Sequence, residues 1–209
     1  MFTHILGSQV NHKTLKLQAL RLQHQWPQST ILPFPTGNKM RTHYTTDRLL
    51  LDSLTSDDAE FILKLVNTAG WLKFIGDRNI RTVDDARAYV QRILDNPHQQ
   101  YRVARLRGEN IPIGVITLIK KDYLEHHDIG FAFLPEYAGS GYAYEAAVSV
   151  LEDVINDPAH NTILATTVKD NSSSIKLLEK LGLRFDKEIN VGGEPLFVYG
   201  VSREKLLPR

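Results

Sequence analysis

A short glycine-rich segment, Gly139-Ser140-Gly141, constrains this 209-residue chain more than any other part of its sequence. An apolar run at residues 129–134 precedes it, and a helical stretch at residues 142–155 follows it. Two glycines one residue apart let the backbone approach a ligand with no Cβ in the way. The start of a helix has unpaired N–H groups and a partial positive charge, which suit a phosphate. The sequence therefore predicts either an ordinary strand-to-helix turn or an anion-binding loop here.

Composition narrows the class of protein. The chain is 42% hydrophobic and 23% charged with a formal net charge of +1, so we expect one sizeable core and no nucleic-acid partner. The sequence has no cysteine, which excludes disulfides and a cysteine nucleophile and fits a cytoplasmic protein. No apolar run approaches the roughly 20 residues of a membrane helix. The first residues also lack the features of a signal peptide, so we expect no membrane partner.

The chain divides into two regions. In residues 1–40, leucines spaced among polar residues predict a short helix, and a proline-rich segment after it breaks any regular structure. We expect this N-terminal extension to pack on the main domain or on a partner subunit, and the second case would give a homodimer. The main domain covers residues 41–209.

Hydrophobic periodicity in the main domain predicts a strand, two helices, three strands, a helix, a strand, a helix and two final strands. Two segments, Thr55–Asp58 and Thr82–Asp85, have the spacing of helix capping boxes. The expected strands before the final pair cover residues 48–54, 101–107, 113–119, 128–134 and 162–168, and the expected helices begin near residues 59, 82, 142 and 172. The order is that of a mixed α/β domain rather than a regular βαβ array.

Three segments carry a family resemblance. They are Asp128-Ile-Gly-Phe131, the glycine loop with its flanks from Leu134 to Ala146, and Asn171-Ser-Ser-Ser174 with the helix that ends at Gly182. In this order and at these separations they resemble the acyl-CoA-dependent N-acetyltransferases of the GNAT superfamily. Within that superfamily they look like the branch that acetylates ribosomal-protein N-termini. The likeness covers about residues 45–201. It implies a mostly antiparallel central sheet with flanking helices, acetyl-CoA as cosubstrate and direct acetyl transfer to a primary amine.

The resemblance also implies where coenzyme A binds. The backbone of the strand would pair with the pantetheine amides, and the loop and first helical turn would present N–H groups to the pyrophosphate. Asn171 would contact the pantetheine region while capping its helix, although capping alone also explains an asparagine there. The residues implied for the cofactor are Phe131, Ala132, Phe133, Ala138, Gly139, Ser140, Gly141, Tyr142, Ala143 and Asn171.

The loop departs from the family pattern at two positions. Glu136 stands where the family generally has Gln or Arg, and Ser140 stands where a basic residue is common. With fewer side-chain cations, binding would depend on backbone amides, so we expect moderate cofactor affinity.

The chemistry of the transfer points to catalytic candidates. An attacking amine must be neutral, and an α-amine, with a pKa of about 8, is easier to deprotonate than a lysine by roughly 3 kcal/mol. Asp128 matches the strand position where several relatives carry a glutamate base, and its shorter side chain favours a water relay. The alternative for Asp128 is a strand-edge acid that faces solvent. Many relatives use a tyrosine later in the helix that begins near residue 172 to protonate the departing thiolate, and this chain has none there. Ser174 is therefore the candidate acid. Glu145 is expected to support the loop by hydrogen bonding.

Four residues are candidates for contact with the acceptor amine. Trp71, Phe74 and Arg78 lie in the segment that borders the acceptor site in similar folds, and His127 is at the start of the strand. The alternatives are core anchors for the two aromatic residues and a polar strand end for His127. We expect no metal at His126-His127, because adjacent strand residues point to opposite faces.

Other functions remain open at this point. A dinucleotide-binding loop would require a regular βαβ unit and a third glycine near position 144, where this chain has Tyr144. A CoA-sensing module that has lost catalysis would keep the same loop. Within the acetyltransferase reading, the acceptor is a protein N-terminus, an aminoglycoside, a polyamine or a small amino acid.

Overall fold

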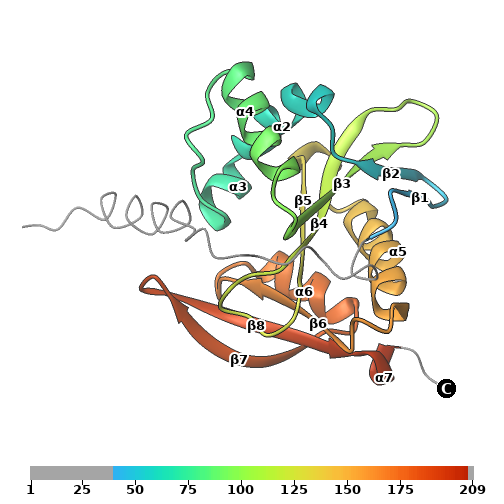
Figure 1. The fold of residues 1–209 in the computed structure, drawn as a ribbon, viewed down its shortest axis with the longest axis vertical. Helices are drawn as coiled ribbons and strands as arrows, with labels where there is room; N and C mark the ends of the chain where they lie inside the picture. Colours follow the sequence, from blue (N-terminus) through green and yellow to red (C-terminus); the bar gives the residue numbers. More distant parts are fainter. Residues whose placement is uncertain (1–39, 207–209) are drawn as a thin grey trace, which may run out of the picture.

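The computed structural model describes residues 40–206, and the predictions made for residues 1–39 lie outside this range. Eight strands form one sheet in the order β1-β2-β3-β4-β5-β6-β8-β7 (Figure 1). Every neighbouring pair is antiparallel except β5 and β6, which are parallel. The strands are β1 (His43–Thr45), β2 (Leu49–Ser53), β3 (Gln99–Leu106), β4 (Pro112–Ile119), β5 (Asp128–Phe133), β6 (Thr162–Thr167), β7 (Arg184–Val191) and β8 (Glu194–Ser202). The expected mixed α/β fold with a mostly antiparallel sheet is confirmed.

Helices cover the two faces of this sheet. One face packs against α2 (Ala59–Val66), α3 (Ala69–Phe74) and α4 (Val83–Leu94). The other packs against α5 (Tyr142–Asn156) and α6 (Ser172–Lys180). Strand alternation produces this division, since Val103 and Val115 enter the first core and their neighbours Ala104 and Ile116 enter the second. The short helices η1 (Ser56–Asp58), η2 (Pro135–Tyr137) and α7 (Arg203–Leu206) complete the fold.

The predicted capping boxes define where two helical segments begin. Thr82 accepts a hydrogen bond from Asp85 N at 3.1 Å, and Asp85 accepts one from Thr82 N at 2.9 Å. The same reciprocal pair joins Thr55 and Asp58 at the start of η1, directly before α2. Both pairs satisfy N–H groups that a helix leaves unpaired, so the predicted helix starts are confirmed.

Five short elements of three to six residues were not predicted: β1, α3, α7, η1 and η2. Elements of this length show too few turns or alternations for a periodic signal. Met40, assigned to the extension, is already part of the core, with 2% of its surface exposed. Its carbonyl accepts a hydrogen bond from the buried Arg102 at 2.8 Å.

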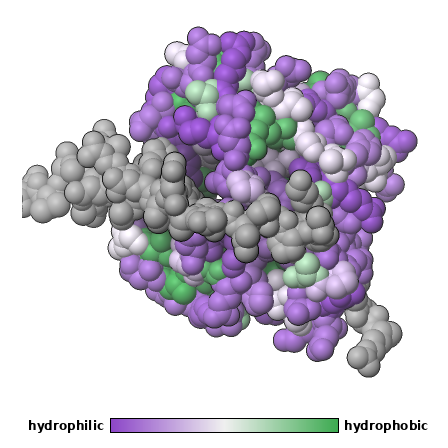
Figure 2. All heavy atoms as spheres, viewed as in Figure 1, coloured by the Kyte–Doolittle hydropathy of each residue, from purple (hydrophilic) through white to green (hydrophobic). Residues whose placement is uncertain are grey.

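The visible surface is mostly hydrophilic, with hydrophobic residues in small groups rather than one continuous band (Figure 2). Among the helices of residues 40–206, none is long and apolar enough to cross a membrane.

Candidate active site

The sheet separates between its two parallel strands. β5 and β6 share a single register pair, Asp128 with Leu164, whereas β4 and β5 pair at six positions. Leu164 N donates to His127 O at 2.9 Å and fixes the closed end of this split. Within the described residues, no strand pairs with this edge of β5 beyond Asp128 (Figure 1). An extended ligand can therefore add to β5 as an extra strand.

The strand residues expected to bind pantetheine lie along this unpaired edge. Phe131 and Phe133 are half-buried and pack against the core under α5, while Ala132 packs towards the α2–α4 face. Gly114 on β4 makes room for Phe133, because a Cβ there would lie 2.3 Å from the phenyl ring. Sequence reasoning did not identify this requirement.

The glycine loop joins η2 to α5 through two left-handed residues. Gly139 has a φ of +75° and Gly141 a φ of +81°, a region that residues with a Cβ rarely adopt. Gly141 is the N-cap of α5 and makes no side-chain cap. A Cβ on Gly139 would meet no atom within 4 Å, so the loop is open on that side.

Unpaired N–H groups follow from this geometry. The first backbone bond at the start of α5 runs from Glu145 N to Gly141 O at 3.0 Å, so the N–H groups of residues 141–144 have no partner within the helix. Ala138 differs from the rest of the expected set, because its N–H already donates to Pro135 O at 3.0 Å. The remaining groups, with the partial positive charge of a 15-residue helix, fit a pyrophosphate.

Arg48 and Glu145 brace the loop from the β1–β2 side. Glu145 accepts hydrogen bonds from Thr46 Oγ1 at 2.6 Å, Arg48 N at 2.9 Å and Arg48 Nε at 2.6 Å. Arg48 Nη1 donates to Ser140 O at 3.0 Å. Partial burial alone would raise the pKa of Glu145, but the hydrogen bonds from Thr46 and Arg48 outweigh it and hold that pKa below its usual value. The expected supporting role of Glu145 agrees with these contacts.

Glu136, the other departure from the family pattern, pairs with Lys64 of α2 at 2.6 Å. Both side chains are exposed, and the hydrogen bond from Lys64 lowers the pKa of Glu136. Glu136 is therefore ionised beside the loop at neutral pH, and the ion pair joins η2 to α2.

Asp128 lies at the closed end of the split and is 3% exposed. Its Oδ1 is 3.0 Å from Lys121 Nζ, and its Oδ2 accepts a hydrogen bond from Thr166 Oγ1 at 2.8 Å. Lys121 Nζ also donates to Thr166 Oγ1 at 2.6 Å, which closes a three-residue network. The alternative interpretation of Asp128 as a solvent-facing strand acid is therefore wrong. Burial alone would lower the pKa of Lys121, but Asp128 and Tyr123 together outweigh burial and raise it, so Lys121 is an ammonium at neutral pH.

Asn171 and Ser174 meet at the start of α6. Asn171 Oδ1 accepts a hydrogen bond from Ser174 N at 3.2 Å, which is the expected N-cap. Ser174 is half-buried. Because α6 follows β6, these two residues belong to the side of the split opposite β5.

The three early acceptor candidates fall in and after α3. Trp71 is 7% exposed in the core with α2 and α4, so its alternative role as a core anchor holds, and its indole N–H makes no hydrogen bond to the described residues. Phe74 and Arg78 are half-buried. Arg78 is close enough to the buried Tyr101 hydroxyl to influence it electrostatically.

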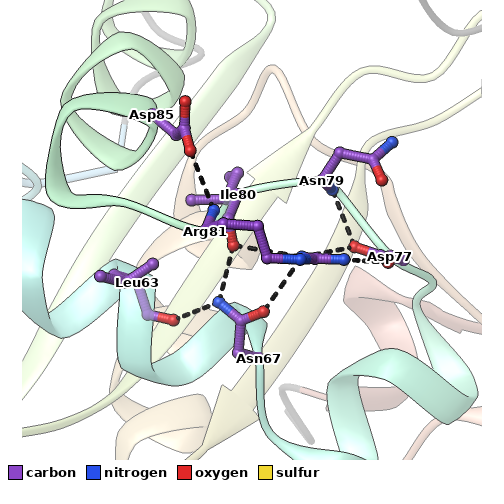
Figure 3. A network of polar contacts seen from close by, with 7 residues as sticks. All are labelled: Leu63, Asn67, Asp77, Asn79, Ile80, Arg81 and Asp85. Atoms are coloured by element: carbon purple, nitrogen blue, oxygen red, sulfur yellow. Dashed lines mark hydrogen bonds and ion pairs between the residues drawn. The ribbon is translucent and has the colours of Figure 1, made fainter.

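A polar network fixes the loop that carries Arg78 (Figure 3). Arg81 binds Asp77 through both terminal nitrogens, and Asp77 Oδ1 accepts from Asn79 N at 2.8 Å. Asn67 Nδ2 donates to Ile80 O at 2.9 Å. Arg78 therefore lies between Asp77, whose carboxylate is bound by Arg81, and Asn79, whose N–H is bound by Asp77.

His127 is buried, 8% exposed, and its ring lies edge-on to that of His160 at 4.7 Å. Burial and the neighbouring His160, Lys120, His98 and His126 lower the pKa of His127 to about 4. His127 directly precedes β5, and its contact with the acceptor stays a prediction. No group of three or more His, Cys, Asp or Glu in the described part of the chain is arranged to hold a metal.

The sheet is mostly antiparallel and splits between its two parallel strands, and the N-terminus of α5 lies uncapped beside the split. This arrangement suits an enzyme that binds an extended ligand ending in phosphates. Residues 48–184 match the family model described as an acetyltransferase (GNAT) domain. The chain belongs to the GNAT acetyltransferase family, whose members use acetyl-CoA.

Known proteins similar to the chain agree. An uncharacterized N-acetyltransferase, YnaD of Bacillus subtilis, is 31% identical over 156 residues, which are 73% of this chain and 91% of that protein. A GNAT-family acetyltransferase structure from Bacillus anthracis is 28% identical with a TM-score of 0.66, covering 78% of this chain and 99% of that one. The ribosomal-protein-S5-alanine acetyltransferase of Vibrio fischeri, 17% identical with a TM-score of 0.66, covers 80% of this chain and 100% of that one and shares the fold. Family and relatives indicate an N-acetyltransferase.

Proposed function

We propose that the chain transfers the acetyl group of acetyl-CoA directly to a primary amine, and that a protein N-terminal α-amine is its acceptor. The observation that carries this proposal is the unpaired edge of β5 next to the uncapped N-terminus of α5. The two features offer strand-type hydrogen bonds to the pantetheine amides and N–H groups to the pyrophosphate.

The transfer forms a C–N bond and breaks the C–S bond of the thioester. A backbone N–H between Phe131 and Phe133 polarises the thioester carbonyl, which is the electrostatic contribution we expect to be largest. Asp128 takes the proton of the amine through water, and Ser174 returns a proton to the departing thiolate directly or through water. No covalent enzyme intermediate is needed, in agreement with a chain that has no cysteine.

The Lys121–Asp128 pair supports an α-amine as the acceptor. Both carboxylate oxygens of Asp128 are already engaged, Oδ1 by Lys121 Nζ at 3.0 Å and Oδ2 by Thr166 Oγ1 at 2.8 Å, so we expect Asp128 to give an attacking amine only modest help. A weak base suffices for an α-amine, with a pKa of about 8, and is poorly suited to a lysine side chain at about 10.4. The likeness to the branch that acetylates ribosomal-protein N-termini favours the same acceptor.

Calorimetric titration with acetyl-CoA, CoA and NAD in parallel tests the cofactor. We expect both CoA forms to bind and NAD not to bind. Absence of CoA binding would overturn the proposal, and NAD binding would make the glycine loop a dinucleotide site.

An acceptor screen that detects released thiol tests the second half. It compares a peptide with a free α-amine and no lysine, the same peptide acetylated at its N-terminus with one internal lysine, spermidine and an aminoglycoside. We expect turnover with the free α-amine. Turnover confined to spermidine or the aminoglycoside would replace the peptide acceptor by a small-molecule amine.

A further inference from the structure

Arg48 contacts three parts of the glycine loop and the helix after it, although it precedes β2. Its Nε and Nη2 each lie 2.6 Å from Glu145 Oε2. Its Nη1 donates to Ser140 O at 3.0 Å, and its guanidinium stacks on the Tyr142 ring at 4.4 Å. A single side chain thus fixes the loop peptide relative to the first turn of α5.

The bond to Ser140 O sets the direction of the next N–H group. In a trans peptide the C=O and N–H bonds point in opposite directions. With the Ser140 carbonyl held on the guanidinium, the N–H of Gly141 points away from Arg48. It belongs to the same open helix end as the unpaired N–H groups of Tyr142 and Ala143.

The same peptide has an alternative orientation that would oppose anion binding. Rotation of this peptide changes ψ of Ser140 and φ of Gly141, and the glycine, at a φ of +81°, makes the rotation inexpensive. A rotated Ser140–Gly141 peptide would present a carbonyl oxygen in place of the N–H, and that oxygen repels a phosphate. It would also lose the hydrogen bond to Arg48, so Arg48 favours the N–H orientation.

The charge on Arg48 is already compensated. Glu145, 18% exposed, binds the guanidinium and also accepts from Thr46 and from the backbone of Arg48. The pair therefore contributes little net charge at the loop. Its contribution is geometric, and a lysine, as a point charge without a planar fork, cannot hold Glu145 and Ser140 O together.

We propose that Arg48, held by Glu145, is a positioning residue that keeps the Ser140–Gly141 peptide in the orientation which presents its N–H to the CoA pyrophosphate. This inference rests on the proposed function. It replaces the missing basic loop residue by an arginine 92 positions earlier in the chain.

The test compares a ligand that has the pyrophosphate with one that lacks it. Calorimetry gives the Kd for CoA, and initial rates give kcat/KM with acetyl-CoA and with acetyl-pantetheine as donors. The variants are Arg48→Met, which keeps apolar contact with Tyr142, and Arg48→Lys, which keeps the charge. Arg41→Gln is the matched control, because Arg41 pairs with Asp153 of the same helix at 2.7 Å, far from the loop. Thermal melting confirms that each variant is folded.

We expect both Arg48 variants to raise the Kd for CoA about tenfold, the effect of one lost charge-assisted hydrogen bond. We also expect kcat/KM with acetyl-pantetheine to stay within about twofold, and Arg41→Gln to change neither quantity. Wild-type affinity in Arg48→Lys would overturn the positioning role in favour of simple charge. Equal losses with both donors would make Arg48 a general structural residue. Failure of the wild-type protein to bind CoA would overturn the proposed function and this inference together.

Discussion

The two sides of the candidate site are built in different ways. The side formed by β5, the glycine loop and α5 presents backbone groups: an unpaired strand edge and the N–H groups of an uncapped helix. The proposed acceptor side consists of side chains from separate segments, among them Arg78 after α3 and the Lys121–Asp128–Thr166 network. Backbone recognition depends on a few glycines and tolerates other substitutions, whereas side-chain recognition changes with each residue. We therefore expect substitutions on the backbone side to matter at a few glycines, and substitutions on the side-chain side to matter at each residue.

Substitution of Gly141 by valine breaks the backbone side and has the largest expected effect. A residue branched at Cβ is strained at a φ of +81°, and its Cβ would lie 3.4 Å from Arg48 Nη2. We expect the calorimetric Kd for CoA to rise by about 100-fold or more, because the loop must rearrange. Gly193→Val is the control, since Gly193 has a φ of +90° in the β7–β8 turn with nothing within 4 Å of a Cβ. Equal CoA affinity in the two variants would contradict the loop assignment.

Substitution of Asp128 by asparagine tests the side of the site that is built from side chains. We expect kcat to fall about 100-fold, the usual size of a general-base contribution, with little change in the Kd for CoA. The variant also leaves Lys121 without its carboxylate, which destabilises the fold by about 3 kcal/mol. Asp128→Asn combined with Lys121→Met should recover stability in urea unfolding but not turnover. Recovered turnover would show that Asp128 acts through the fold rather than as the base.

Acidification tests the closed end of the split, where the two sides meet. The pKa of His127 is about 4 in the folded chain and 6.5 ordinarily, so the unfolded chain binds more protons between these values. The contribution of His127 to the unfolding free energy, roughly 3 kcal/mol, is therefore fully present above pH 6.5 and is lost as the pH decreases towards 4. Urea unfolding at pH 7.0, 5.5 and 4.5 measures the slope, which His127→Gln should reduce. An unchanged slope would assign the acid sensitivity to other groups.

Removal of the Ser174 hydroxyl tests whether this side chain protonates the departing thiolate. With Ser174→Ala we expect kcat to fall about fivefold, because water partly replaces the acid, and the Kd for CoA to stay the same. Ser173→Ala, at an exposed position of the same turn, is the control. Identical rates in the Ser174→Ala and Ser173→Ala variants would mean that water, and not Ser174, protonates the thiolate.

Glu136→Gln has the smallest expected effect. It removes an ionised acid beside the loop and an exposed ion pair with Lys64, and such exposed pairs contribute little to stability. We expect CoA to bind about twofold more tightly at low salt, with no difference at high salt, because exposed charges are screened. Weaker binding at low salt would mean that Glu136 supports the loop rather than opposing the phosphate.

The parts of the molecule predicted from the sequence are those with local signals. Capping boxes at Thr55 and Thr82 marked the helix starts, and glycine spacing marked the loop. The residues missed have partners far along the chain. Arg48 and Glu145 are 97 positions apart, and Thr166 and Asp128 are 38 apart. Neither pair has a periodic or local pattern, and only the sheet topology brings each together.

The acceptor side shows the same limit. The sequence predicts a segment that would border the acceptor, but it gives no sign of the side chains that fix the loop of this segment, Asn67 and Arg81 (Figure 3). Their contacts are to backbone carbonyls and to a turn aspartate, which depend on the path of the folded loop. The catalytic and acceptor roles of Asp128, Ser174, Phe74 and Arg78 stay predictions.

The single register pair between β5 and β6 has a consequence for the life of the protein in the cell. The two halves of the sheet are joined between β5 and β6 by this one pair, and under the proposed function acetyl-CoA binds where the two strands separate. A ligand that binds only the folded chain adds about 2.7 kcal/mol of stability at a hundredfold excess over its Kd. Turnover by proteases would then depend on metabolic state. The protein would accumulate when acetyl-CoA is abundant and be degraded faster when it is scarce.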